Sequence, residues 1–214
     1  MTALIETVRV IDGQVPLWPF HLARLEQSAH AVGLPMPALT APAHGDDRVV
    51  RYEISSSGVT ISEREPVPTV PLVLATSPAP HRGYRHKTTD RAWLEAARTS
   101  VQALGADDAL LLDGDGFVIE ATNWAIGWWD GERLFFPPLS LGGLPSVARA
   151  RLAETVRGGI HTAALRYEEL AWRSLVACNA ARGMVLVSAL DGEPVPGNLR
   201  TTAVSSRFWR RRPG

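Results

Sequence analysis

The segment YRHKTTDR, residues 84–91, contains Lys87, the only lysine of this 214-residue chain. The other 21 of its 22 basic residues are arginine. A guanidinium stays protonated, whereas a desolvated ammonium group can lose its proton and act as a nucleophile. A lone lysine in an arginine-rich chain is therefore a candidate for an amine with a chemical role. The alternative is a lysine on a solvated loop, and composition alone leaves both readings open.

Composition and charge narrow the classes of protein to which the chain can belong. Hydrophobic residues make up 45% of the sequence and charged residues 21%, as in an ordinary globular protein. The formal net charge is zero, so the sequence shows no electrostatic footprint for nucleic acid or an anionic membrane. No apolar run approaches the roughly 18 residues that a membrane span needs. We expect neither nucleic acid nor a membrane among its partners.

Cysteine and histidine usage bears on location and on metals. The single cysteine, Cys178, excludes a framework of internal disulfides and suits a reducing compartment. Residues 1–10 are typical of a strand and not of a signal peptide, so we expect a cytoplasmic protein. The six histidines show no paired spacing of the kind that metal sites use. We therefore expect no structural metal.

The first 80 residues predict a small antiparallel sheet that carries one helix. Residues 4–11 are β-rich and end at the turn signal Asp12-Gly13. From Phe20 to Gly33 the apolar residues recur at every third or fourth position, which predicts a helix. Three further β-like stretches complete the predicted sheet: 48–55, 59–63 and 70–75.

The rest of the chain predicts a larger β-rich unit. A linker at 78–83 leads into the lysine segment, and the apolar pattern of 93–104 predicts a helix that ends at Gly105. A meander of strands then follows, which is typical of one face of a sheet or of an open barrel. We predict strands at 109–113, 117–120, 123–129, 133–136, 160–165, 174–178 and 184–190, and a helix at 147–156.

Three polar features of this pattern each have two readings. Periodicity alone favours Arg24 as a surface residue paired with Glu26 or Asp12. Glu120 follows three apolar residues in a strand, and it is either buried with a partner or simply solvated. The glycine-containing turn at 141–146 opens a helix whose first N–H groups can hold a phosphate, although most such turns are ordinary caps.

The chain contains six motifs in an order that resembles the class IV aminotransferase family. Members of this family are the fold type IV enzymes, which use pyridoxal phosphate. The lysine segment is most similar to that of the family's aminodeoxychorismate lyases. Each motif alone is moderately specific, and six in the correct order make the resemblance strong. They are ETVRV with Asp12-Gly13 (6–13), HLARL (21–25), HKTTDR (86–91), DALLLD with GFVIE (108–120), GLPSVAR (143–149) and CNAARG (178–183).

The resemblance implies a fold class, a cofactor and an assembly. It implies an α+β protein with a small N-terminal domain over residues 1–80 and a larger, open-barrel-like domain over residues 81–214. Pyridoxal 5'-phosphate would lie in the cleft between them, and the chain would form a homodimer. The ligand would be a small-molecule amine.

The resemblance also implies site residues. Lys87 would form the Schiff base with the cofactor and move protons, with Thr7 as a second catalytic residue near the ring. Glu120 would face the pyridine nitrogen, and His86 would shape the lysine loop. The implied cofactor-binding residues are Arg24, Lys87, Glu120, Thr122, Asn123, Ser146, Val147 and Ala148. The implied substrate-binding residues are Asn179, Ala180, Ala181 and Arg182.

The chain departs from the family pattern at the phosphate site. Ser146 replaces a usual glycine, and Ala148 stands where many relatives have a threonine that binds phosphate. These changes bear on cofactor affinity more than on cofactor identity.

Three functions are consistent with the motifs. We expect a lyase that converts 4-amino-4-deoxychorismate to 4-aminobenzoate and pyruvate in folate biosynthesis. The first alternative is an aminotransferase for D-amino or branched-chain amino acids. The second is a non-catalytic relative, and the retained amine of Lys87 argues against it.

Overall fold

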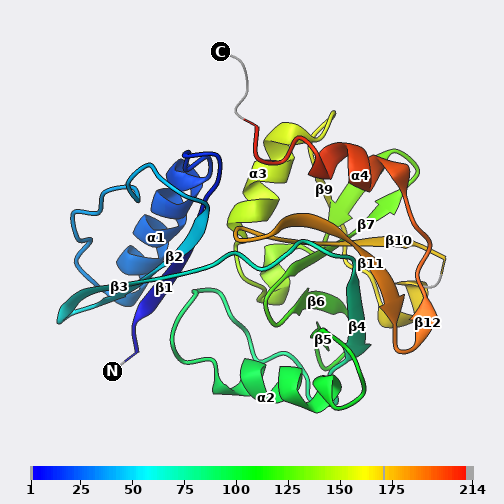
Figure 1. Ribbon diagram of the computed structural model, residues 1–214. Helices are drawn as coiled ribbons and strands as arrows, with labels where there is room; N and C mark the ends of the chain where they lie inside the picture. Colours follow the sequence, from blue (N-terminus) through cyan, green and yellow to red (C-terminus); the bar gives the residue numbers. More distant parts are fainter. Residues whose placement is uncertain (1, 171, 211–214) are drawn as a thin grey trace.

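The computed structural model describes residues 2–170 and 172–210 (Figure 1). The chain forms a three-stranded and a nine-stranded sheet that lie beside each other. The mixture of helices with these sheets confirms the predicted α+β class. Among the described residues, no helix is both long enough and apolar enough to cross a membrane.

The smaller sheet is antiparallel in the order β1 (Leu4–Val10), β2 (Arg48–Ser55), β3 (Gly58–Arg64). Helix α1 (Trp18–Val32) packs on one face and ends at Gly33, which adopts the left-handed conformation that favours glycine. Side chains of β1, β2 and α1 form a hydrophobic core between the helix and the sheet. Strand β3 is exposed along its whole length, because α1 reaches only the first two strands.

The larger sheet curls around a second core (Figure 1). Its order is β6-β5-β4-β11-β10-β7-β8-β9, and β12 pairs with β11. The strands are β4 (Leu72–Thr76), β5 (Asp108–Leu112), β6 (Val118–Ala121), β7 (Ala125–Asp130), β8 (Arg133–Phe136), β9 (His161–Thr162), β10 (Ser174–Asn179), β11 (Gly183–Leu190) and β12 (Glu193–Pro194). The helices are α2 (Ala92–Gln102), α3 (Val147–Thr155) and α4 (Leu199–Ser205), with 3-10 turns η1 (Leu139–Leu141) and η2 (Tyr167–Leu170).

Two sequence predictions about strands are wrong. The stretch 70–75 does not join the small sheet: β4 pairs in parallel with β5 and β11, and the small sheet ends with β3. Parallel pairing with a strand more than 100 residues away leaves no local signature in β4. The strand predicted at 160–165 is limited to His161–Thr162. The division into domains 1–80 and 81–214 stays a prediction, although β4 belongs to the sheet formed mainly by residues after 81.

The lysine segment ties the two sheets together at the edge of β1. The N–H of Ile5 donates to the carbonyl of Lys87 at 2.7 Å, and the N–H of Thr89 donates to the carbonyl of Ala3 at 2.9 Å. The hydroxyl of Thr89 accepts a further hydrogen bond from the N–H of Ala3 at 2.9 Å. These bonds fix the backbone of Lys87 against β1, although the two segments are more than 80 residues apart in sequence.

Candidate active site

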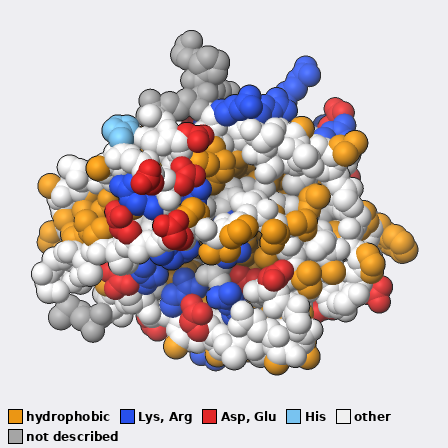
Figure 2. Space-filling model, viewed as in Figure 1, with side chains coloured by type: hydrophobic (Ala, Val, Ile, Leu, Met, Phe, Trp, Pro, Cys, Tyr) orange, Lys and Arg blue, Asp and Glu red, His pale blue; other side chains and the backbone are white. Residues whose placement is uncertain are grey.

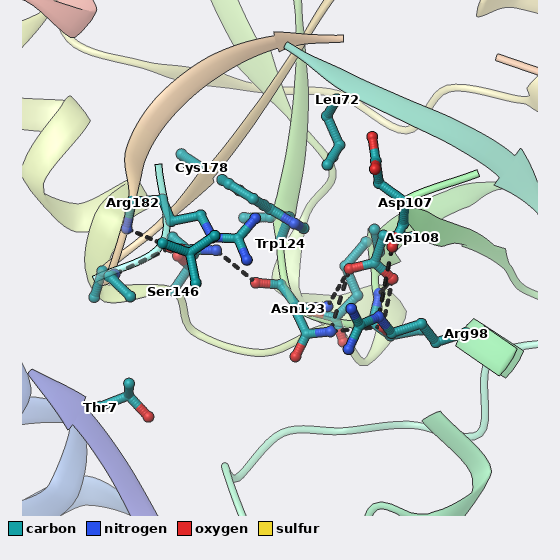
Figure 3. A pocket seen from close by; sticks show the side chains of 18 of the residues that line it. Thr7, Leu72, Arg98, Asp107, Asp108, Asn123, Trp124, Ser146, Cys178 and Arg182 are labelled. Carbon is teal, nitrogen blue, oxygen red and sulfur yellow. Dashed lines mark hydrogen bonds between the residues drawn. The ribbon is translucent and has the colours of Figure 1, made fainter. Parts of the chain in front are cut away.

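A cavity of about 830 Å³ is lined by residues of both sheets. Lysine and arginine side chains gather around the hollow on the face that Figure 2 shows, with acidic side chains between them. Figure 3 shows Thr7 of the small sheet on one side of this space and Asn123, in the loop after β6, on the other. The predicted site residues that line the cavity are Thr7, Arg24, Lys87, Glu120, Thr122, Asn123, Ser146, Val147, Asn179, Ala180, Ala181 and Arg182.

Lys87 presents its amine to this cavity from a backbone that β1 holds in place. Burial, reinforced by the charges of Arg24 and Arg91, lowers the pKa of Lys87 from 10.5 to about 7, and Glu6 opposes the change. At neutral pH a large share of the Lys87 side chain is therefore the neutral amine, which is the nucleophilic form. The reading of Lys87 as a lysine on a solvated loop is wrong.

Arg24 lies on the buried face of α1 and makes a bidentate ion pair with Glu6 of β1. Its Nε donates to Oε1 at 2.9 Å and its Nη2 to Oε2 at 2.5 Å. His21, three residues earlier on the same helix face, has its Nδ1 2.6 Å from Oε2. Burial alone would raise the pKa of Glu6, but Arg24 and His21 outweigh burial and lower it to about 2. The surface pairing of Arg24 with Glu26 or Asp12 is therefore wrong.

Glu6 and His21 are not among the predicted site residues, although the position of Glu6 on β1 indicates a buried ion pair. Strand alternation puts Glu6 on the same face of β1 as Leu4, Val8 and Val10, all of which are buried. A carboxylate on that face needs a buried partner, and Arg24 of α1 supplies a guanidinium. Thr7 points to the other face of β1, toward the cavity.

The first turn of α3 leaves backbone donors at the cavity wall. Ser146 caps the helix by accepting from the N–H of Arg149 at 3.3 Å. The N–H groups of Val147 and Ala148 have no acceptor in the part of the chain that the structure describes. Arg24 reaches the same corner, where its Nη1 donates to the carbonyl of Pro145 at 3.3 Å. Free amides at a helix start beside an arginine suit an anion.

Ala148 is placed differently from the other predicted cofactor residues. Its side chain is fully buried in a hydrophobic cluster of the large sheet and does not line the cavity. This position therefore offers no hydroxyl to an anion.

Glu120 on β6 is buried, so the solvated reading of this residue is wrong. Its Oε2 accepts from the N–H of Leu144 at 3.1 Å, and its Oε1 lies 3.0 Å from Nε2 of His81. The carboxylate lines the same cavity as Lys87. Its position suits a partner for a protonated ring nitrogen.

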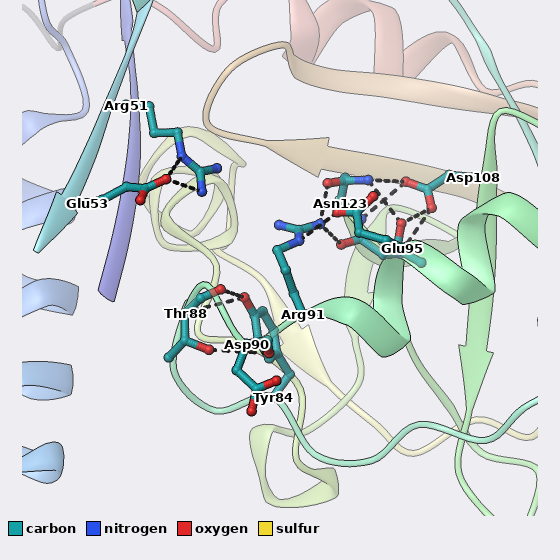
Figure 4. A network of polar contacts seen from close by, with 10 residues as sticks. Arg51, Glu53, Tyr84, Thr88, Asp90, Arg91, Glu95, Asp108 and Asn123 are labelled. Atoms are coloured by element: carbon teal, nitrogen blue, oxygen red, sulfur yellow. Dashed lines mark hydrogen bonds and ion pairs between the residues drawn. The ribbon is translucent and has the colours of Figure 1, made fainter. Parts of the chain in front are cut away.

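Asp108 fixes the loop after β6, as Figures 3 and 4 show. Its Oδ1 accepts from both the N–H and the hydroxyl of Thr122, and its Oδ2 accepts from the N–H and the amide nitrogen of Asn123. Burial raises the pKa of Asp108, which these hydrogen bonds oppose. Arg91 donates to Oδ1 of Asn123 at 2.9 Å, so the segment that carries Lys87 is also attached to this loop.

The loop between β10 and β11 brings Arg182 to the cavity. The side-chain oxygen of Asn179 accepts from the N–H groups of Ala181 and Arg182, at 3.0 and 2.8 Å, and this shapes the loop. The Arg182 guanidinium lies 5.4 Å from the ring centre of Trp124. No carboxylate within the described residues makes an ion pair with Arg182.

Other predicted residues hold the lysine segment in shape. His86 has its Nδ1 3.1 Å from the hydroxyl of Ser28 on α1, as expected for a residue that shapes the loop. The hydroxyl of Tyr84 donates to the carbonyl of Thr88 at 2.9 Å and accepts from its N–H at 3.0 Å (Figure 4). Within the described residues, no group of acidic, histidine or cysteine side chains could hold a metal ion.

Comparison with known proteins finds relatives with named activities. A Schizosaccharomyces pombe protein provisionally named aminodeoxychorismate lyase is 31% identical over 176 residues, which are 74% of this chain and 75% of the relative. A solved structure from Mesorhizobium loti, provisionally named an amino-acid aminotransferase, is 26% identical with a TM-score of 0.78, and the match covers 88% of this chain and all of that one.

Two further solved structures share the fold at lower identity. The first, from Legionella pneumophila, is provisionally named 4-amino-4-deoxychorismate lyase; it is 20% identical with a TM-score of 0.82, covering 96% of this chain and 91% of that one. The second, a hypothetical aminotransferase from Mycobacterium tuberculosis solved in a PLP-bound form, is 20% identical with a TM-score of 0.81, covering 97% and 89%. The family model for amino-transferase class IV matches residues 55–190. This chain is therefore a member of the class IV aminotransferase family of enzymes.

Proposed function

We propose that the protein is a pyridoxal-phosphate-dependent lyase that converts 4-amino-4-deoxychorismate to 4-aminobenzoate and pyruvate, a step of folate biosynthesis. The observation that carries the proposal is the amine of Lys87, with a pKa of about 7, in one cavity with an anion-binding corner and a buried carboxylate. The Schizosaccharomyces pombe relative, by its name, favours the lyase over other reactions of the family.

The residues present fit the cofactor. The unpaired N–H groups of Val147 and Ala148, together with Arg24, suit a phosphate. Glu120 suits the ring nitrogen, and the amine of Lys87 suits the aldehyde carbon. When bound, pyridoxal phosphate withdraws electrons from the substrate carbon that carries the amine. Arg24 keeps donors for the phosphate because its bonds to Glu6 and to the Pro145 carbonyl occupy Nε and only one hydrogen each of Nη1 and Nη2.

In this proposal Lys87 moves the protons. With the substrate amine held by the cofactor, neutral Lys87 Nζ would take the proton from the amine-bearing ring carbon. The bond between the ring and the enolpyruvyl oxygen breaks, the ring becomes aromatic, and the departing fragment gains a proton on its methylene carbon to become pyruvate. The ammonium of Lys87 is the donor for that proton. Thr7 lies on the cavity side of β1, where it can contact the reacting groups.

The charge of the cavity supports a substrate with two carboxylates. Arg64 of β3, Arg98 of α2 and Arg182 line its wall together. Burial lowers the pKa of Arg182, and the charges of Arg64 and Arg98 lower it further, while Asp107 and Asp108 oppose the change. Like charges near one another are relieved by an anionic ligand. We assign the loop 179–182, with Arg182 as its charged member, to substrate binding.

Aminotransferase activity is the second candidate function. The specific observation in its favour is the similarity to the Mesorhizobium loti structure, whose whole chain is covered by the match. The same Lys87, Arg24 and Glu120 would serve, so the choice between the reactions depends on the substrate. A non-catalytic relative is the least supported reading, because a buried amine with a lowered pKa at a cavity is typical of functional sites. We also propose a homodimer, as the family resemblance implies.

A spectroscopic titration tests the proposal. We expect purified protein to develop a visible absorption band with added pyridoxal phosphate, and expect Lys87→Ala to lack it. Borohydride reduction followed by mass spectrometry should place the cofactor on the peptide that contains Lys87. If an amino acid then bleaches the band, the aminotransferase is supported; if aminodeoxychorismate is converted to 4-aminobenzoate instead, the lyase is supported. A wild-type protein without any Lys87-dependent band would contradict both.

A further inference from the structure

His81 lies in the segment 78–83, which the sequence predicts to be a linker. In the structure its side chain is 2% exposed, and its Nε2 is 3.0 Å from Oε1 of Glu120. We infer that His81 is a positioning residue that holds Glu120 as an oriented carboxylate for the ring nitrogen of the cofactor. This inference rests on the proposed cofactor, but it concerns a residue that lies outside the six motifs.

The hydrogen bonds of His81 determine which nitrogen carries the proton. The N–H of Gly83 donates to Nδ1 at 3.0 Å, so Nδ1 must present a lone pair. The proton of the neutral ring is then on Nε2, which donates to Glu120. A doubly protonated ring would lose the bond from Gly83. The local backbone therefore selects a neutral histidine that donates to the carboxylate.

Both oxygens of Glu120 are engaged by donors. Oε1 accepts from His81 and Oε2 accepts from the N–H of Leu144 at 3.1 Å. Neither of these donors can accept a proton from the carboxyl group, so the pattern matches the ionised form. Each oxygen keeps a further lone pair for the ring nitrogen. Gly143 avoids crowding beside the carboxylate: a β-carbon there would lie 3.2 Å from Cγ2 of Ile119 and 3.8 Å from Oε2 of Glu120.

Aromatic packing holds the His81 ring in this orientation. Trp93 of α2 meets the ring edge-to-face, with centroids 5.3 Å apart and planes at 84°. The same tryptophan packs on Tyr84 at 6.3 Å, and the hydroxyl of Tyr84 is bonded to the backbone of Thr88. One short segment, 81–91, thus positions both the reactive amine and the partner of the ring nitrogen.

His81 suits the orientation of Glu120 because its ring donates a hydrogen bond without carrying a charge. An arginine or lysine at this position would also orient Glu120, but its charge would compete with a protonated ring nitrogen for the same carboxylate. An uncharged N–H donor orients the group and leaves its negative charge for the ring. His81 therefore maintains the ring nitrogen in its protonated form through Glu120.

The test uses the holoenzyme loaded with pyridoxal phosphate that carries ¹⁵N in its ring. We would record the ¹⁵N chemical shift of wild type, His81→Gln, His81→Leu and Glu120→Gln. Glu120→Gln gives the reference for a ring nitrogen without its carboxylate. We expect His81→Leu to move the shift toward that reference, and we expect His81→Gln, whose side-chain amide can still donate, to stay near wild type. His30→Leu, an exposed histidine on α1, is the matched control.

The outcomes separate the inference from the proposed function. A wild-type ¹⁵N shift in His81→Leu, whether or not cofactor affinity falls, would mean that the residue is merely structural and would overturn the inference alone. A His81→Gln shift equal to that of His81→Leu would also contradict it, because the donor would then not be the relevant feature. Failure of wild type to form a Lys87-dependent band would overturn the proposed function and the inference with it.

Discussion

Replacing Lys87 with methionine should make the cofactor-free protein more stable. The structure lowers the pKa of Lys87 to about 7, against 10.5 for the ordinary side chain. Between these two values the unfolded chain binds one proton more than the folded chain, so folding must remove a proton from a group that would otherwise keep it. Methionine has a similar length and no charge, and it removes this cost.

The magnitude follows from the difference between the two pKa values. At 1.36 kcal/mol for each pKa unit, the full difference corresponds to about 5 kcal/mol, and about 4 kcal/mol of this applies at pH 7. The free energy of unfolding of wild type should rise with pH from 7 to about 10.5, whereas that of Lys87→Met should lack this rise. The advantage of the variant should therefore shrink by about 1 kcal/mol from pH 7 to 8 and by about 1.3 kcal/mol from pH 8 to 9.

Urea denaturation of the cofactor-free proteins at pH 7, 8 and 9 measures these quantities. Arg85→Met is the matched control, because Arg85 is an exposed cation two residues away on the same segment. We expect the control to change stability by less than about 0.5 kcal/mol, without the same dependence on pH. A Lys87→Met variant that is no more stable than wild type at pH 7, or whose advantage is constant from pH 7 to 9, would refute the reasoning.

Three further predictions concern other parts of the structure. Because the pKa of Glu6 is lowered from 4.5 to about 2, its ionised form stabilises the fold above pH 4.5. The free energy of unfolding of wild type should therefore fall by about 3 kcal/mol between pH 4.5 and 2, and that of Glu6→Gln, measured over the same pH range, should not show this fall. Arg182→Gln should raise KM for aminodeoxychorismate at least tenfold, the effect of losing about 1.4 kcal/mol of binding, while borohydride trapping on Lys87 stays unchanged. Gly127→Ala should lower the free energy of unfolding by about 2 kcal/mol in urea, because its β-carbon would lie 2.6 Å from the carbonyl oxygen of Phe135; wild-type stability would argue against this contact.

Local patterns predicted the elements of this fold better than their pairing. Most strands and helices lie close to where turn signals and apolar periodicity placed them. The sheet to which β4 belongs was predicted wrongly, because its partners β5 and β11 are selected by packing and not by its own five residues. Pairing of this kind depends on contacts that a local window of sequence does not contain.

In the candidate site, too, the sequence predicts some residues and not the contacts that support them. Unusual composition singled out Lys87, and an ordered set of motifs brought Arg24 and Glu120 into the same hypothesis; the structure places all three at one cavity. Their specific roles stay predictions. The supporting residues were missed, since Glu6 and His81 differ from ordinary polar residues only in what surrounds them. Burial converts such side chains into positioned partners, and burial is a property of the folded chain.

The bonds between the lysine segment and β1 also bear on the order in which the protein folds. Ala3 is hydrogen-bonded to Thr89, which is 86 residues away in the sequence, and β4 pairs with β11, which is more than 100 residues away. Contacts of such long range form late, after local turns and hairpins. The environment that lowers the pKa of Lys87 therefore requires that both sheets are complete. In an incomplete chain Lys87 would be an ordinary, protonated lysine, which is a poor nucleophile.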